Sequence, residues 1–223
     1  MQPGDAERPS GDPSALIEPS ALIELVEIMA RLRRECGWKA AQTHRTLARY
    51  LLEEAYEVLE ALDTGDHEHL REELGDLLLQ VYFHAAIAAE EGRFDIEDVA
   101  ADLAAKLIRR NPHVFGDVQA TDPAEIDANW QAIKEAEKQR TDPLEGIPRE
   151  LPALLRAAKV LDRLERAGVP VSLEADPADL GDRLLALVAE ARLAGVDAEQ
   201  ALRHAVRRHT PAPPGSGTAP QLG

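Results

Sequence analysis

Two pairs of carboxylates are the residues in this chain whose types and spacing could do chemistry. Glu54 and Glu57 stand three positions apart, and so do Glu73 and Asp76. Side chains at positions i and i+3 of an α-helix lie on the same face, so each pair would offer two oxygen donors one turn apart. Magnesium takes oxygen ligands and commonly binds carboxylates together with the phosphates of a substrate. The spacing therefore suggests a divalent cation site as one interpretation of these residues.

The charge around these pairs is strongly unbalanced, which leaves two interpretations open. Ten acidic residues and one basic residue, Arg71, lie between Glu53 and Asp76. Like charges this dense are tolerated when solvent or a hard cation compensates them. Acidic residues of an amphipathic helix often form no more than its solvated face. Glu54, however, lies only about 60° around the helix from Leu51, the middle of the apolar stripe, so it flanks the packing surface.

The two pairs need two neighbouring helices to hold them, and the apolar periodicity predicts both. One helix is expected over about 42–62 and the next over about 68–91, joined by the turn 63–66. A connection this short makes the two helices an antiparallel hairpin, in which the carboxylate pairs can face each other. Further helical stretches are expected at about 21–35, from an N-cap at Asp95 to about Arg110, 123–140, 151–167 and Asp179–Arg208. Since no segment shows a β alternation, the fold class is predicted to be all-α.

Composition restricts the class of protein further. The chain has 25 Lys and Arg against 41 Asp and Glu, so its formal net charge is −16. A protein this acidic repels the nucleic-acid backbone, and no nucleic-acid partner is expected. No apolar run approaches the roughly 20 residues that cross a bilayer, so no membrane partner is expected. The single cysteine, Cys36, fits a reducing compartment, and a cytoplasmic location is predicted.

Proline, glycine and polar residues divide the chain into five segments. Residues 1–19 are expected to form a disordered leader and residues 210–223 a disordered tail. A helical domain is predicted over 20–141, followed by a Pro- and Gly-containing linker over 142–150. Residues 151–209 form a second, shorter helical part.

Several motifs resemble those of one family, the MazG-type nucleotide pyrophosphohydrolases. Glu53-Glu54-Ala-Tyr-Glu57 followed by Glu72-Glu73-Leu-Gly-Asp76 is similar to the family's Glu-Glu-x-x-Glu … Glu-x-x-Asp signature. The resemblance also includes Leu25–Arg34, Cys36-Gly-Trp38, Gln42-Thr-His44, Lys106–Arg110, Asn111–Gly116 and Asn129-Trp130 … Lys134. It covers about residues 22 to 165, with the motifs in the family's order.

The resemblance implies a fold, a reaction and a set of residue roles. The fold is an all-α, MazG-like helical bundle around a carboxylate metal site, usually in paired subunits, which implies a homodimer. The reaction is the hydrolysis of a nucleoside triphosphate to a monophosphate and pyrophosphate with Mg²⁺, for which Mn²⁺ can substitute. The implied metal ligands are Glu54, Glu57, Glu73 and Asp76.

Four other residues match family positions with different roles. Glu53 matches the extra glutamate that orients or deprotonates the attacking water. Lys106 and Arg110 match positions that contact phosphates, and Trp130 matches an aromatic position near the nucleotide. From the residues alone, Lys106 and Arg110 also suit a helix C-terminus, where positive charge opposes the helix dipole.

Two features depart from the family pattern. In the loop after Cys36, Lys39 stands where the family has an acid and Ala40 where a basic residue is common, which puts nucleotide contacts by this loop in doubt. In the C-terminal part, Asp179-Leu-Gly-Asp182 echoes Glu73-Leu-Gly-Asp76, but no Glu-Glu-x-x-Glu helix precedes it. Residues 151–209 are therefore interpreted as a degenerate second MazG-like segment without its own metal site.

Three functions remain open at this point. The first is a pyrophosphohydrolase that accepts many nucleoside triphosphates, for nucleotide-pool cleaning or nucleotide-level control. The second is a narrow pyrimidine deoxynucleotide hydrolase, which the two-domain ancestry disfavours. The third is a catalytically weak, nucleotide-binding helical dimer that acts as a regulator.

Overall fold

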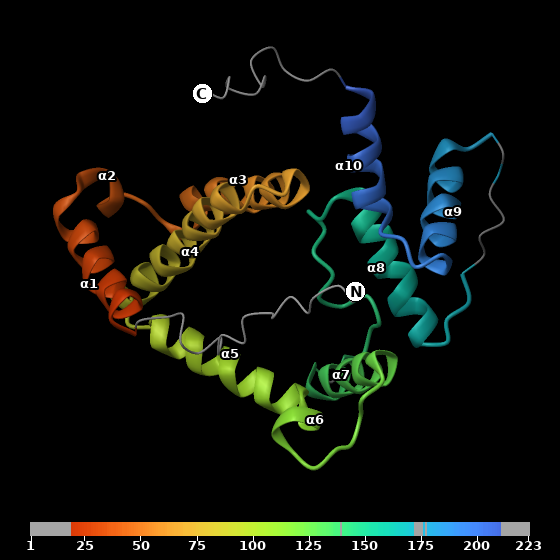
Figure 1. Ribbon diagram of the computed structural model, residues 1–223, viewed down its shortest axis with the longest axis horizontal. Coiled ribbons are helices and arrows are strands. Elements are labelled where there is room, and N and C mark those ends of the chain that lie inside the picture. The colour runs from red at the N-terminus through yellow and green to blue at the C-terminus, as the bar shows by residue number, and fades with distance from the viewer. Residues whose placement is uncertain (1–18, 139, 172–175, 177, 211–223) are drawn as a thin grey trace, which may run out of the picture. The chain divides into compact units, whose positions relative to one another are not determined.

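The computed structural model describes residues 19–138, 140–171, 176 and 178–210, and in this part of the chain the regular structure is entirely helical (Figure 1). The helices are α1 (Pro19–Glu35), α2 (Gly37–Ala40), α3 (His44–Thr64), α4 (His67–Glu90), α5 (Ile96–Arg110), α6 (Pro112–Phe115), α7 (Pro123–Lys138), α8 (Ala153–Arg166), α9 (Leu180–Leu193) and α10 (Ala198–His209). The predicted all-α class is confirmed. Residues 1–18 of the predicted leader and 211–223 of the predicted tail lie outside the described residues, whereas Pro19, the last residue of the predicted leader, begins α1.

The hairpin of α3 and α4 is defined by its capping residues. Thr43 begins α3 with a capping box, in which its hydroxyl accepts from the Thr46 amide and the Thr46 hydroxyl accepts from the Thr43 amide. Gly65 ends α3 in the left-handed conformation at φ 71°, which suits glycine. Asp66 then caps α4 by accepting from the amides of Glu68 and His69. This short turn places α3 and α4 side by side and antiparallel, as predicted (Figure 1).

The core of the N-terminal part lies where α1 packs on the hairpin. Its buried members come from α1, α3 and α4, and they are Met29, Leu47, Tyr82, Phe83 and Ile87. Tyr82 also ties the helices together, because its hydroxyl donates to the carbonyl oxygen of Leu22 on α1 at 3.0 Å. These residues lie toward the end of the hairpin away from its turn, so the carboxylate end of α3 and α4 projects beyond the core.

A buried arginine connects α1, α4 and the loop before α3. The Arg33 guanidinium makes a two-pronged pair with Glu90, with Nε–Oε1 at 2.8 Å and Nη2–Oε2 at 2.5 Å. Its Nη1 donates to the carbonyl oxygens of Lys39, Ala40 and Gln42, the last two at 3.2 and 3.1 Å. One side chain therefore satisfies the carbonyls at the end of α2 and orients the chain as it enters α3.

The chain divides into two compact units between Trp130 and Gln131, inside α7. This division comes earlier than the predicted linker over 142–150, because Gln131 and Glu135 at the C-terminal end of α7 bond to Arg166 of α8. The assignment of 20–141 and 151–209 to two family-like domains stays a prediction.

The second unit is built from α8, α9 and α10 around Leu161, Val188 and Ala189. The helical stretch expected over Asp179–Arg208 is helical as predicted, but it consists of two helices, α9 and α10, and not of one. Gly195 adopts φ 69° just after α9, and Asp197 caps a new helix, α10. Glycine in this conformation ends a helix, and that local preference outweighs the helical composition on both sides.

Of the helices described, none is both long and apolar enough to cross a membrane.

We expect Arg33→Met to lower the free energy of unfolding by about 2–4 kcal/mol, because it removes, at a part-buried site, the donor to the Lys39, Ala40 and Gln42 carbonyls and the partner of Glu90. Arg31→Met on the same helix is the matched control. Arg31 pairs with Glu35 at an exposed surface, so its loss should cost less than about 0.5 kcal/mol. Urea unfolding followed by circular dichroism measures both, and equal effects of the two substitutions would contradict the structural role of Arg33.

Candidate metal centre

Three of the four predicted metal ligands gather between α3 and α4. A carboxylate oxygen from each of Glu54, Glu57 and Glu73 lies within 4.8 Å of the other two. Glu73 is buried, while the two glutamates of α3 are partly exposed. Glu54 and Glu73 are 19 positions apart in the sequence, and the short capped turn between α3 and α4 brings them together.

Glu54 is the group most affected by its neighbours. Burial is the first cause that raises the pKa of its carboxyl, to about 7, followed by a hydrogen bond with Glu57 and by the charges of Asp76, Glu57 and Glu73. A carboxyl so placed keeps a proton near neutral pH unless a positive charge compensates the cluster. The donor set consists of hard oxygen atoms with excess negative charge, which fits a hard divalent cation.

Asp76 lies one turn after Glu73 on α4, and its role as a ligand stays a prediction. It is partly buried, and among the three neighbouring carboxylates its charge is the one that raises the pKa of Glu54 most. Its oxygens fall outside the set that lies within 4.8 Å of one another in the described residues. The Asp76 side chain therefore lies near the cluster but is not one of the three carboxylates that are within 4.8 Å of one another.

Glu53 is exposed on α3, next to Glu54 in sequence and about 100° around the helix from it. The position leaves its carboxylate open to solvent at the edge of the cluster. Its role toward a water molecule stays a prediction.

Two residues that the sequence analysis missed contact the cluster directly. His69 Nε2 lies 2.9 Å from Glu73 Oε1, one turn away on α4. Gln80 is buried, and its Nε2 donates to Glu54 Oε1 at 3.4 Å. Both lie at helical spacings from Glu73, four positions before it and seven after it. The i,i+4 spacing of His69 is a signal that could have indicated its contact, whereas the contact of Gln80 is to Glu54 on the other helix.

A histidine pair lies farther along the same interface. His44 and His84 stack with ring centroids 5.0 Å apart, and their Nδ1 atoms are 2.7 Å apart, so one nitrogen must donate to the other. Burial, followed by the charge of His44, lowers the pKa of His84. A hydrogen bond between the two imidazole rings therefore connects the start of α3 to α4.

The three predicted nucleotide-contacting residues divide into a pair and a single residue. Arg110 is buried, and its guanidinium carbon lies 5.0 Å from the centroid of the Trp130 ring, a cation–π contact. Lys106 is exposed on α5. The described structure brings Arg110 and Trp130 together, but neither Arg110 nor Lys106 is among the charges that act on Glu54.

The altered loop after Cys36 has a structural role. The Lys39 ammonium lies 5.4 Å from the ring centroid of Trp38 and 5.2 Å from that of Phe83. Its backbone carbonyl accepts from Arg33. Lys39 thus covers the core where an acid was expected.

The C-terminal echo of the carboxylate motif differs in its placement on the helix. Asp179 is the N-cap of α9 and accepts from the Asp182 amide at 3.0 Å, whereas Glu73 and Asp76 both lie inside α4. Asp179 is therefore occupied with helix capping, and the two aspartates do not form an i,i+3 pair on a helix face.

Comparisons with known proteins agree with this arrangement. The model of the MazG nucleotide pyrophosphohydrolase domain matches residues 42–115, which contain the entire carboxylate cluster. The chain is 46% identical to an uncharacterized 26.1 kDa protein of Streptomyces cacaoi, over 82% of this chain and 77% of that protein. It is 42% identical to the nucleoside triphosphate pyrophosphohydrolase of Escherichia coli K12, over 81% of each chain. It is 40% identical to the nucleoside triphosphate pyrophosphohydrolase/pyrophosphatase MazG of Thermotoga maritima, over 83% of this chain and 81% of that protein.

These relatives cover most of both chains, and the matched domain includes the α3–α4 hairpin with Glu54, Glu57, Glu73 and Asp76. The chain therefore belongs to the MazG nucleotide pyrophosphohydrolase family.

Proposed function

We propose that this protein hydrolyses nucleoside triphosphates to the monophosphate and pyrophosphate at the carboxylate cluster of α3 and α4. The observation that carries the proposal is the convergence of Glu54, Glu57 and Glu73 within the segment that matches the family. Relatives in Escherichia coli and Thermotoga maritima are named nucleoside triphosphate pyrophosphohydrolases. A cytoplasmic location stays a prediction.

We further propose that the cation is Mg²⁺, with Mn²⁺ as a substitute, and that Glu54, Glu57, Glu73 and Asp76 hold it. The fit rests on the oxygen donors and on the raised pKa of Glu54, which burial raises first and the neighbouring carboxylates raise further. When bound, such a cation neutralises the triphosphate and favours a nucleophilic water. His69 and Gln80 position the ligand carboxylates by their contacts with Glu73 and Glu54.

The reaction requires a water oxygen to bond to the α-phosphorus while the bond from that phosphorus to the bridging oxygen breaks. In the proposal, Glu53 accepts the proton of the water, and pyrophosphate leaves with the electron pair of the broken bond. Lys106 and Arg110 bind phosphate oxygens, and Trp130 stacks on the base. The contact between Arg110 and Trp130 supports a shared role for these two residues.

A homodimer is the proposed assembly. The hairpin exposes large apolar side chains on both helices, among them Leu52 at 58%, Leu62 at 55% and Leu74 at 49%. A two-helix hairpin with exposed apolar faces is covered when a second one packs on it as a four-helix bundle. A second copy of this chain would supply those helices.

The assigned reaction and ligands predict a specific loss of activity. Glu57→Gln and Asp76→Asn should each lower turnover by about 100-fold or more, because each removes a charged oxygen donor from the centre. Glu60→Gln, an exposed position on α3, is the matched control and should change little. The measurement is chromatography of the products from each nucleoside triphosphate with Mg²⁺, with circular dichroism to check helicity.

The products also separate the proposed function from its alternatives. Monophosphate plus pyrophosphate supports the assignment, while diphosphate plus phosphate would place the attack at another phosphorus. A wild-type protein that binds nucleotides without turnover would favour the regulator.

The raised pKa of Glu54 predicts pH-dependent cation binding. Without a cation, the folded state holds a proton here that the unfolded state has lost, so stability falls as pH rises from the ordinary glutamate pKa through about 7. A cation selects the ionised form, so Mn²⁺ should bind about tenfold more weakly at pH 6 than at pH 8 and should displace a proton at pH 6. Calorimetry at both pH values measures this, and Glu54→Gln should remove most of the dependence. An affinity of the wild type that is equal at both values would refute the assigned pKa.

The proposed dimer predicts a mass change. Leu74→Glu should convert the protein to a monomer, because it places a charge in the apolar face of α4. Leu193→Glu makes the same kind of change in the second unit, at a side chain that is 86% exposed, and should leave the mass unchanged. Sedimentation velocity gives both masses. A monomeric wild type, or a dimer lost only in Leu193→Glu, would rule out pairing through the hairpin.

A further inference from the structure

A cavity in the second unit gathers positive charge in a chain that is otherwise acidic. It has a volume of about 390 Å³ and lies between the end of α7, the segment 140–143 and α8. Three of its lining residues are arginines, Arg140, Arg163 and Arg166, and one is acidic, Glu135. Three guanidinium groups around one small cavity are an unusual concentration of positive charge in a chain whose net charge is −16.

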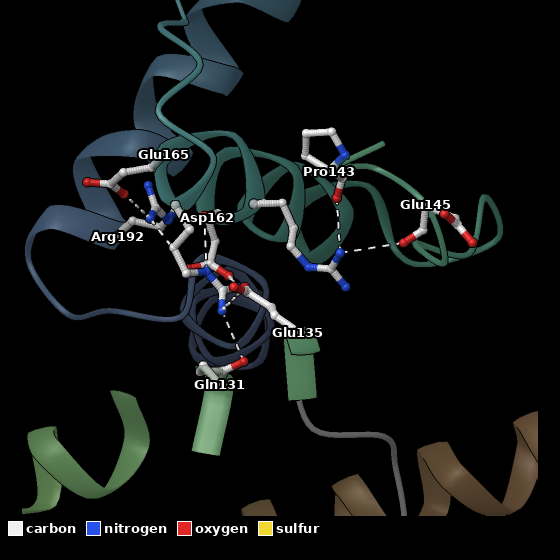
Figure 2. Close-up of polar contacts among 9 residues, drawn as sticks. Gln131, Glu135, Pro143, Glu145, Asp162, Glu165 and Arg192 are labelled. Atoms are coloured by element: carbon white, nitrogen blue, oxygen red, sulfur yellow. Dashed lines mark hydrogen bonds and ion pairs between the residues drawn. The ribbon is translucent and has the colours of Figure 1, made fainter. Parts of the chain in front are cut away.

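Arg166 is the arginine whose charge is compensated. It pairs with Glu135 at 3.3 Å and with Asp162, and it donates to the side-chain oxygen of Gln131 at 3.0 Å. Figure 2 shows Gln131, Glu135 and Asp162 grouped on one side of the close-up. Glu135 is therefore engaged by Arg166, and its charge acts on Arg163 only as a minor influence.

Among the described residues, the hydrogen-bond partners of Arg163 are neutral carbonyl groups. Its Nη1 donates to the carbonyl oxygens of Pro143 and Glu145, at 3.0 and 3.5 Å, and these lie on the other side of the close-up (Figure 2). Burial first, and then the positive charges of Arg140 and Arg166, lower the pKa of Arg163, and Glu135 and Asp162 offset this only in part. The group thus keeps donors and a charge for which the described chain has no direct carboxylate partner.

Arg140 is the second of these arginines, and it is partly buried like Arg163. Within the described residues no hydrogen bond or ion pair holds its guanidinium, although the residue is partly buried. Its Nη2 lies 3.6 Å from the place that a Cβ on Gly146 would occupy. Gly146 has φ 76°, so the turn that follows Pro143 passes close to this guanidinium without a side chain between them.

We propose that this cavity binds a phosphate-bearing anion, with Arg140 and Arg163 as the donors to its oxygens. Guanidinium groups suit phosphate because their planar forks offer paired donors to two oxygens, and they remain charged on burial. The rest of the lining includes apolar side chains of Pro143, Ala167 and Val169, against which a sugar or base could pack. Free phosphate or pyrophosphate and the phosphates of a nucleotide share the recognised chemistry.

The site is independent of the carboxylate centre in its requirements. The carboxylates repel a phosphate unless a cation is bound, whereas guanidinium groups attract it without one. Binding in the presence of EDTA therefore reports the arginine cavity and does not depend on turnover. A failure of this proposal leaves the proposed hydrolysis standing, and the reverse also holds.

The test is calorimetry on the full chain in EDTA at low salt, with phosphate, pyrophosphate, a nucleoside monophosphate and a nucleoside triphosphate as separate ligands. The wild type should bind at least one of them, and Arg140→Gln should weaken that binding by about tenfold or more, the value of one charge-assisted hydrogen bond. Arg163→Lys keeps the charge and a donor to Pro143, yet it loses the fork, so it should weaken binding as well.

Two controls locate the site. Arg183→Gln removes one positive charge at an exposed position of α9, outside the cavity, and should leave the affinity within about twofold. Glu57→Gln alters the carboxylate centre and should not weaken binding in EDTA. Binding of pyrophosphate or phosphate alone identifies a free anion as the ligand, and binding of nucleotides alone identifies an organic phosphate. If no ligand binds the wild type, or if Arg140→Gln and Arg183→Gln bind equally well, the proposal is wrong.

Discussion

Repulsion among carboxylates held between α3 and α4 is the constraint on which the rest of the N-terminal unit depends. Four acidic side chains that influence one another would separate if their helices could move apart. The turn at Gly65 and Asp66 fixes the helices at one end, and the core around Leu47 and Phe83 fixes them toward the other. Burial raises the pKa of Glu54, so its carboxyl keeps a proton near neutral pH when no cation is bound. A divalent ion that binds at the cluster would displace this proton.

The elements around the hairpin can be understood as support for this arrangement. Arg33 pairs with Glu90 of α4 and satisfies the carbonyls that precede α3, so α1 sets how the chain enters the hairpin. Lys39 packs over the Trp38 and Phe83 rings, which shows why a basic residue in this loop is compatible with the fold. The hydrogen-bonded pair of His44 and His84 then joins the first turn of α3 to α4. Polar contacts thus fix the same interface that the apolar core fills.

Local signals predicted most of the fold, and long-range pairing was what they could not predict. Capping residues such as Asp95 and the apolar periodicity marked the helices, because both act within a few residues. The Arg33–Glu90 pair joins positions 57 apart, and nothing at either position indicates the other. The i,i+3 spacing together with the short turn predicted that Glu54, Glu57 and Glu73 would lie near one another, but neither could reveal that Gln80 would contact Glu54 across the hairpin. Asp179 and Asp182 have the same spacing as Glu73 and Asp76. Because α9 begins at Leu180, however, Asp179 is the N-cap of the helix and not a residue of its face.

The two proposed phosphate sites, one in each unit, use side chains of opposite charge. The first concentrates carboxylates, so phosphate can approach only when a cation intervenes, and the cation then acts as part of the chemistry. The cavity of the second is lined by three arginines and one carboxylate, that of Glu135, which pairs with Arg166, so it offers guanidinium donors to a phosphate directly. On the prediction that residues 151–209 are a degenerate MazG-like segment, this unit is suited to hold a phosphate group and not to cleave it. Binding without catalysis is consistent with that prediction, because an anion site needs only charge and donors in place.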